Sequence, residues 1–88
     1  MKISNRNARR FVQDCIPFKG NNLYGEKRGD KFVVFSYGEH HPLFVYKDGV
    51  WYENTEKRSV STSKHRTQAH PHFTTVACDT KTMKNLAV

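Results

Sequence analysis

Three short runs dense in β-branched and aromatic residues constrain the fold of this 88-residue chain more than any other feature. They cover residues 31–37 (KFVVFSY), 43–47 (LFVYK) and 50–53 (VWYE). Residues of these types favour strands. The Asp48-Gly49 pair between the second and third runs is the dipeptide typical of a two-residue hairpin turn. The centre of the chain is therefore predicted to be an antiparallel meander.

The flanking segments predict the rest of an α+β domain. Ser4 can cap a helix over residues 5–15, where apolar residues recur at helical spacing. A first strand is expected over residues 21–27 and a second short helix near 61–69, while residues 73–77 could add an edge strand. The sequence thus predicts a single small domain, residues 1–88. Its antiparallel sheet has three to four strands, with the N-terminal helix packed on one face.

Two further expectations concern the core and the end of the chain. Trp51 is the only tryptophan in a chain of low apolar content, 36%. A large ring in such a chain usually anchors the core, so we expect Trp51 to be at least half buried. Residues 79–88 are expected to form a last helical turn or a loose tail.

The charge of the chain narrows the choice of partner. Fifteen lysines and arginines against eight acids give a net charge of +7. This balance favours nucleic acid, an anionic membrane or an acidic protein. We find neither the apolar segment of a signal peptide nor a stretch long enough to span a membrane. A cytoplasmic protein without a membrane partner is expected, with Cys15 and Cys78 as reduced, buried thiols.

The segment 57–72 combines four fixed cations, three histidines and several hydroxyls with no carboxylate. Hydroxyl groups donate hydrogen bonds and cations supply charge, which together suit a phosphate backbone. Arginines on the polar side of the N-terminal helix would extend this patch. The predicted nucleic-acid-binding residues are Arg6, Arg9, Arg10, Lys57, Arg58, Ser61, Thr62, Ser63, Lys64, His65 and Arg66.

Three members of this patch carry specific expectations. Lys64 and Arg66 should contact phosphates and contribute little to folding, because exposed charges stabilise a protein only weakly. His65 should titrate near the usual histidine pKa of about 6.5 and strengthen binding as it gains a proton.

No catalytic motif is present. The chain lacks GxSxG, a phosphate-binding glycine loop and HExxH, and its carboxylates are scattered. We therefore expect no enzyme, no cofactor and no bound metal. One alternative stays open: His70, His72 and Cys78 could converge on zinc, making this a small metal-binding or hydrolytic protein.

Residues 32–72 carry a pattern that resembles a group of small proteins of bacteriophages and related mobile elements. Its features are Ser-Tyr-Gly before a histidine and a proline, then Trp-x-x-Asn, then a hydroxyl-rich run ending in Ser-Lys-His. The resemblance implies an accessory role in the cytoplasm of a bacterial host, by binding nucleic acid or, alternatively, a host enzyme or defence complex. The matching residues are Ser36, Tyr37, Gly38, His40 or His41, Pro42, Trp51, Asn54, Ser59, Ser61, Thr62, Ser63, Lys64 and His65.

Overall fold

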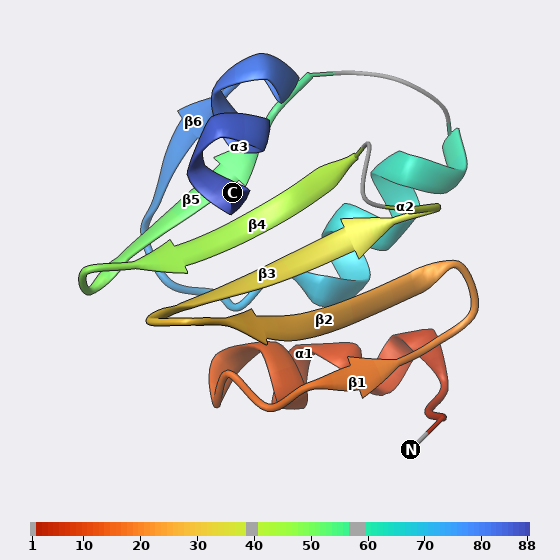
Figure 1. Cartoon of the computed structure of the whole chain (residues 1–88). Helices are drawn as coiled ribbons and strands as arrows, with labels where there is room; N and C mark the ends of the chain where they lie inside the picture. Colours follow the sequence, from red (N-terminus) through yellow and green to blue (C-terminus); the bar gives the residue numbers. More distant parts are fainter. Residues whose placement is uncertain (1, 39–40, 57–59) are drawn as a thin grey trace.

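The structure is a computed structural model and describes residues 2–38, 41–56 and 60–88. Within this described part, six strands form one sheet in which each strand lies beside its neighbour in sequence (Figure 1). All neighbours pair antiparallel except β5 and β6, which are parallel. The strands are β1 (Phe18–Lys19), β2 (Leu23–Arg28), β3 (Lys31–Ser36), β4 (Pro42–Lys47), β5 (Val50–Asn54) and β6 (Thr75–Cys78).

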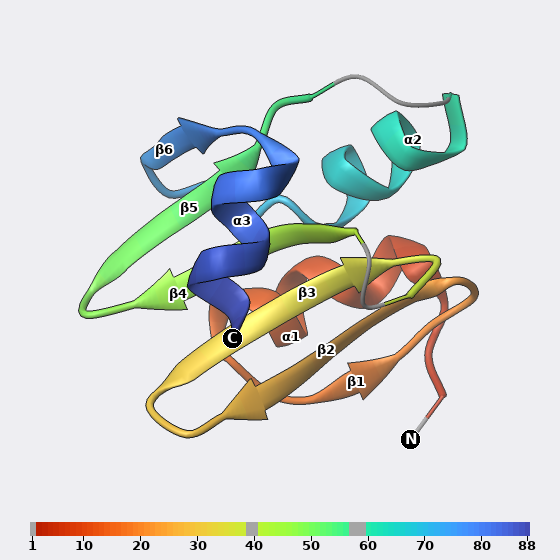
Figure 2. The ribbon, with the colours of Figure 1, turned by 45° about the horizontal axis from the view of Figure 1, so that its top comes forward.

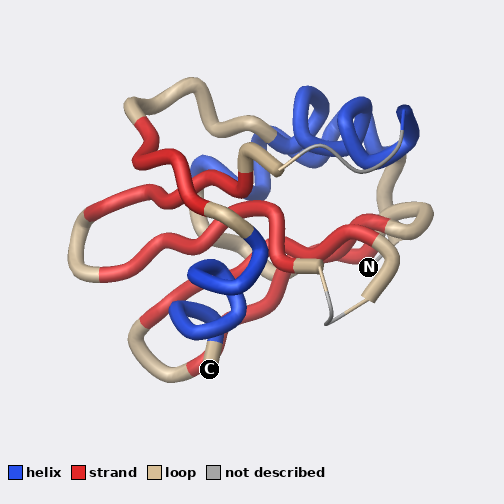
Figure 3. Tube along the Cα trace, turned by 90° about the horizontal axis from the view of Figure 1, so that it is seen from above, coloured by secondary structure: helices blue, strands red, loops and turns tan. Residues whose placement is uncertain are grey.

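Helices cover both faces of the sheet. A short 3-10 turn, η1 (Asn5–Asn7), leads into α1 (Ala8–Gln13). The second helix, α2 (Val60–Ala69), connects β5 to β6 and lies beside α1 on one face, whereas α3 (Thr80–Ala87) lies on the other (Figures 2 and 3). Parallel strands need a crossover connection, and α2 is the helix of that crossover.

The predicted sheet of three to four antiparallel strands is wrong, although the domain is α+β as expected. The described sheet has six strands and is mixed, and helices cover both of its faces. Two additions escaped the sequence pattern for physical reasons. β1 has only two residues, too few to show an alternation, and the parallel pairing of β6 with β5 depends on a contact across the whole of α2.

The helices also differ in detail from their predicted ranges. Residues 5–15 are split between η1 and α1, and the Ser4 side chain makes no capping hydrogen bond. The predicted helix near 61–69 is confirmed as α2, and the predicted hairpin at Asp48-Gly49 is confirmed as well. Both turn residues have positive φ, 52° and 77°, which the two-residue type I′ turn requires.

A bulge adjusts the pairing of β3 with β4. Val34 pairs with Phe44 and Phe35 with Pro42, so Leu43 is the additional residue. A bulge lets two successive side chains serve the same face. Leu43 and Phe44 accordingly both enter the cluster beneath α1 and α2.

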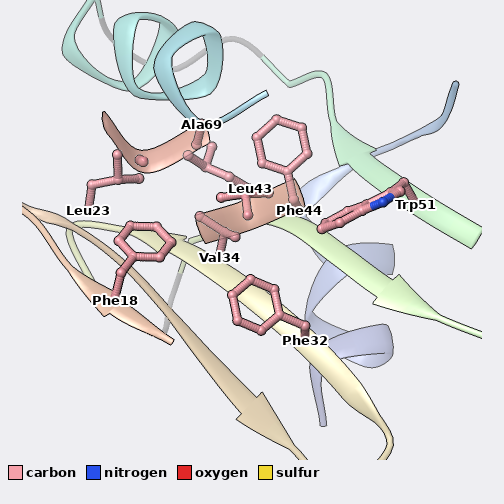
Figure 4. Packing of buried hydrophobic residues seen from close by; sticks show 10 residues of the cluster. Phe18, Leu23, Phe32, Val34, Leu43, Phe44, Trp51 and Ala69 are labelled. Atoms are coloured by element: carbon pink, nitrogen blue, oxygen red, sulfur yellow. The ribbon is translucent and has the colours of Figure 1, made fainter. Parts of the chain in front are cut away.

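Each face of the sheet has its own apolar cluster. The larger lies on the α1 and α2 face and includes Trp51, which is 5% exposed, so its predicted burial is confirmed (Figure 4). Tyr52 contacts the opposite cluster, formed with Met83 and Ala87 of α3. Gly25 is essential to the larger cluster, because a Cβ there would lie 2.6 Å from the Phe18 ring.

Two remaining predictions concern the cysteines and the membrane. Cys15 and Cys78 are free and half-buried, and they contact different clusters. Burial raises the pKa of both thiols. Among the described residues, no helix combines the length and apolar character needed to cross a bilayer.

Candidate nucleic-acid interface

The N-terminal helix meets the C-terminal end of α2 through polar contacts. Arg9 donates from Nε to the His70 carbonyl oxygen at 2.7 Å and from Nη2 to the Thr67 carbonyl oxygen at 2.8 Å. Gln13, one turn later, donates to the Pro71 carbonyl oxygen at 2.8 Å. The last carbonyls of a helix lack intrahelical partners and carry partial negative charge. These contacts therefore fix two regions of the predicted patch side by side, although they are about 60 residues apart in sequence.

Glu53 of β5 organises a second set of polar contacts. Its Oε1 accepts a hydrogen bond from Thr75 Oγ1 at 2.7 Å and lies 3.1 Å from His70 Nε2. Its Oε2 lies 3.5 Å from Arg66 Nε. The Nδ1 atom of His70 accepts the backbone N–H of His72 at 3.0 Å, so Nε2 bears the hydrogen that points to Glu53.

These groups surround a hollow of about 310 Å³. We name it the arginine hollow; it is lined by Arg9, Glu53, Arg66, Thr67, His70 and His72. Arg9 uses Nε and Nη2 in the contacts described above, and Arg66 uses Nε with Glu53 and Nη1 with the Asn54 carbonyl oxygen. Each guanidinium thus uses two of its three nitrogens, and it has five N–H donors in all. Two guanidinium groups against one carboxylate leave the hollow positively charged. Its charge and remaining donors suit a phosphate.

Several predicted site residues lie exposed on the helical segments that supply Arg9 and Arg66, although Arg10 lines a different hollow, with Phe11 and Asp14. Arg6 and Arg10 belong to η1 and α1 and are exposed, as are Ser63 and Lys64 of α2. The structure thus brings the arginines of the N-terminal helix beside α2. Lys57 and Arg58 lie outside the described residues, as does Ser59. Ser61 and Thr62 lie in α2, but their side chains are outside the described part.

His65 is not on the surface that was predicted for it. Its side chain is buried, its Nδ1 lies 2.8 Å from Ser36 Oγ, and its ring packs 5.3 Å from that of Tyr37. Burial lowers the pKa of His65, and the charge of Lys64 lowers it further. We therefore correct its role: His65 attaches α2 to β3, and its buried position near Lys64 disfavours the protonated ring.

Arg66 also differs from its predicted role. Its Nη1 donates to the Asn54 carbonyl oxygen at 3.1 Å, in addition to the ion pair with Glu53. A side chain engaged with two groups of β5 contributes to the position of α2. Replacing it would change the fold as well as the charge, so it is a poor residue with which to test binding alone.

The role of Glu53 was not predicted from the sequence, and the predicted role of His70 and His72 was a different one. The two histidines attracted notice only as possible metal ligands. Nothing local connects them to an acid 17 residues earlier. The parallel pairing of β5 with β6 sets Thr75 opposite Trp51 and Glu53 opposite Ala77, and the Thr75 hydroxyl reaches Glu53 diagonally across the two strands.

Two observations bear on the hydrolytic and metal-binding alternatives. Ser36 and His65 form a hydroxyl–imidazole pair, but Ser36 is fully buried and no substrate can reach it. Among residues 2–38, 41–56 and 60–88, no three histidines, cysteines or carboxylates are grouped to hold a metal ion. In particular, His70, His72 and Cys78 do not converge on a shared site.

Several residues of the phage-like pattern meet in space and hold the layers together. Buried Asn54 donates from Nδ2 to the Pro42 carbonyl oxygen at 3.0 Å and to Thr80 Oγ1 at 3.1 Å. The Ser36–His65 contact lies between β3 and α2. These members of the pattern thus attach helices to the sheet. Among the members whose side chains the structure describes, Tyr37, Ser63 and Lys64 are exposed.

No family model matches the chain, and neither a curated protein nor a solved structure is found to be similar to it. The resemblance to phage proteins therefore stays a prediction. The evidence for the candidate interface is therefore the arrangement of the arginines, Glu53 and the histidines described above.

Proposed function

We propose that this protein binds nucleic acid through its phosphates, without catalysis. The binding region is the surface of η1, α1 and the C-terminal two thirds of α2, which we call the α1–α2 surface. One observation carries the proposal: Arg9 and Arg66, from distant parts of the chain, line the same positively charged hollow. Exposed Arg6, Arg10 and Lys64 add cations to the same two neighbouring helical segments.

The groups on this surface are those with which proteins hold a phosphate backbone. Phosphates are contacted by arginine and lysine together with hydroxyl and backbone N–H donors, and this term is independent of base sequence. The α1–α2 surface supplies exposed Lys64 and Ser63 from the same helix that contributes Arg66 to the arginine hollow. A phage origin and action in the host cytoplasm belong to the same proposal and rest on the resemblance alone.

The test compares two double variants that each remove two positive charges. Arg10→Ala with Lys64→Ala strips exposed cations from the α1–α2 surface, whereas Lys81→Ala with Lys84→Ala strips them from exposed positions of α3. Binding to random-sequence duplex DNA is measured over a range of salt concentrations. For the first variant we expect the slope of log affinity against log salt to fall by roughly 1.8, about 0.9 for each lost phosphate contact.

The α3 variant should keep the slope of the unmodified protein, and circular dichroism should show both variants folded. Equal losses in the two variants would mean that binding follows net charge and has no defined surface. Weak binding that is insensitive to either change would reject the proposal. In that case a dominant protein partner recovered from nuclease-treated bacterial lysate would favour the alternative, a host-interaction protein.

A further inference from the structure

Exposed apolar side chains gather at one place beside the α1–α2 surface. In the described part of the chain, Val50, Phe73 and Val76 are 36%, 52% and 47% exposed. All three line one hollow of about 590 Å³, between the end of α1, the β4–β5 hairpin and the start of β6. Exposed apolar side chains that are grouped in this way mark a binding site more often than scattered ones do.

Aromatic rings dominate this hollow. Tyr46 and Trp51 lie in its wall with ring centroids 4.9 Å apart, and Phe73 contributes a third, exposed ring. Gln13 and Asp14 add polar atoms at the end of α1. An apolar cavity of this size with a few polar groups is typical of a site for a small planar ligand. We call it the aromatic hollow.

The aromatic hollow and the arginine hollow are neighbours. Residues 70–74 contribute to both, because His70 and His72 line the arginine hollow while Phe73 and Thr74 line the aromatic one. The same holds for α1, where Arg9 lines the first and Gln13, one turn later, lines the second. Side chains four residues apart on a helix lie about 6 Å from each other. A cationic site and an aromatic site thus lie within the span of one nucleotide.

We infer that the aromatic hollow accepts an unstacked base of single-stranded nucleic acid whose phosphates lie on the α1–α2 surface. This inference rests on the proposed function and specifies its ligand. A base in a duplex is stacked on both sides and cannot enter the hollow. Bases of a single strand stack readily on aromatic side chains. The carboxylate of Asp14 repels phosphate but accepts hydrogen bonds from the amino group of a base, which places the backbone on the arginine side.

The test uses two single strands of equal length and charge: a 12-nucleotide DNA oligomer and its fully abasic counterpart. Trp51 is the only tryptophan, so its fluorescence reports on the hollow directly. We expect both strands to bind, the base-bearing strand more tightly, and only that strand to quench Trp51. Phe73→Ala should weaken binding of the base-bearing strand by about 5- to 100-fold and leave the abasic strand unaffected.

Tyr37→Ala is the matched control. Tyr37 is exposed to a similar degree, 57%, but packs against His65 and not in the hollow. An equal loss in this control would overturn the inference. Equal affinity for the two strands, unchanged by Phe73→Ala, would overturn it too while leaving the proposed phosphate binding intact. If neither strand binds, the proposed function itself fails. In that case, a partner protein that binds the unmodified chain and Tyr37→Ala but not Phe73→Ala would assign the hollow to a peptide.

Discussion

The two helices that follow the β4–β5 hairpin are attached to opposite faces of one sheet by different interactions. α3 packs apolar side chains: Met83 and Ala87 are buried in the cluster beneath it, and Asp79 caps its first turn by accepting the Thr82 N–H at 2.8 Å. α2 is attached by polar contacts. Its described buried side chains are His65 and Ala69, and Arg9 and Arg66 supply further polar anchors.

This difference predicts how each helix responds to its surroundings. Apolar burial does not depend on ionisation, so α3 should stay in place across the neutral and mildly acidic pH range. A helix attached by an imidazole, two guanidinium groups and a carboxylate depends on the charge state of those groups. The helix on which we place ligand binding is therefore also the one whose attachment a charged ligand or a pH change can alter.

The largest effect is expected from removing the apolar anchor of α3. Met83 is fully buried, and Met83→Ala should lower the free energy of unfolding by about 2–5 kcal/mol, because it leaves a cavity beneath the helix. Urea denaturation measures this loss. Lys84→Ala, at the exposed neighbouring position, should change stability by about 0.5 kcal/mol or less. Similar values for the two variants would show that α3 does not depend on apolar packing.

A smaller loss is expected when the polar anchor of α2 is removed. Ser36→Ala leaves His65 Nδ1 buried without its partner, which typically costs about 1–3 kcal/mol. Ser63→Ala is the control, since Ser63 is exposed on the same helix. Hydrogen exchange should show the loss in α2 and not in α3. Uniform loosening of both helices would contradict the separation between the two faces.

The comparison also explains how far the sequence predicted this structure. The central hairpins follow from alternation and turn residues, and α2 follows from the hydroxyls at its start and from Pro71 after its end. α3 was expected only as a turn or a tail, although Asp79 as cap and the spacing of Thr80, Met83 and Ala87 predict a full helix.

The site was less accessible to sequence reasoning. Composition indicated a segment rich in cations, but it could not separate Lys64, which is exposed, from His65 and Arg66, which face the sheet. Separating them requires knowing which side of α2 faces the strands, and α2 has no apolar stripe to reveal it. The arginine hollow depends on the β5–β6 pairing and on the contact of α1 with α2, both of which are long-range.

The smallest expected effect is a pH dependence confined to α2. The pKa of His65 is lowered in the folded protein by burial and by Lys64, whereas in the unfolded chain it takes its usual value of about 6.5. The unfolded state therefore binds a proton more readily, and folding stability decreases as pH falls through about 6.5 towards the lower folded pKa.

The pKa of Asp79, which caps α3, is lowered from 3.8, so its contribution is lost only at more acidic pH. Between about pH 6.5 and 5, the protection of amides from hydrogen exchange, corrected for the intrinsic exchange rate at each pH, should decrease in α2 and stay constant in α3. His65→Asn keeps a polar partner for Ser36 without an ionisable ring and should remove the dependence. If the variant retains it, another group controls the attachment of α2.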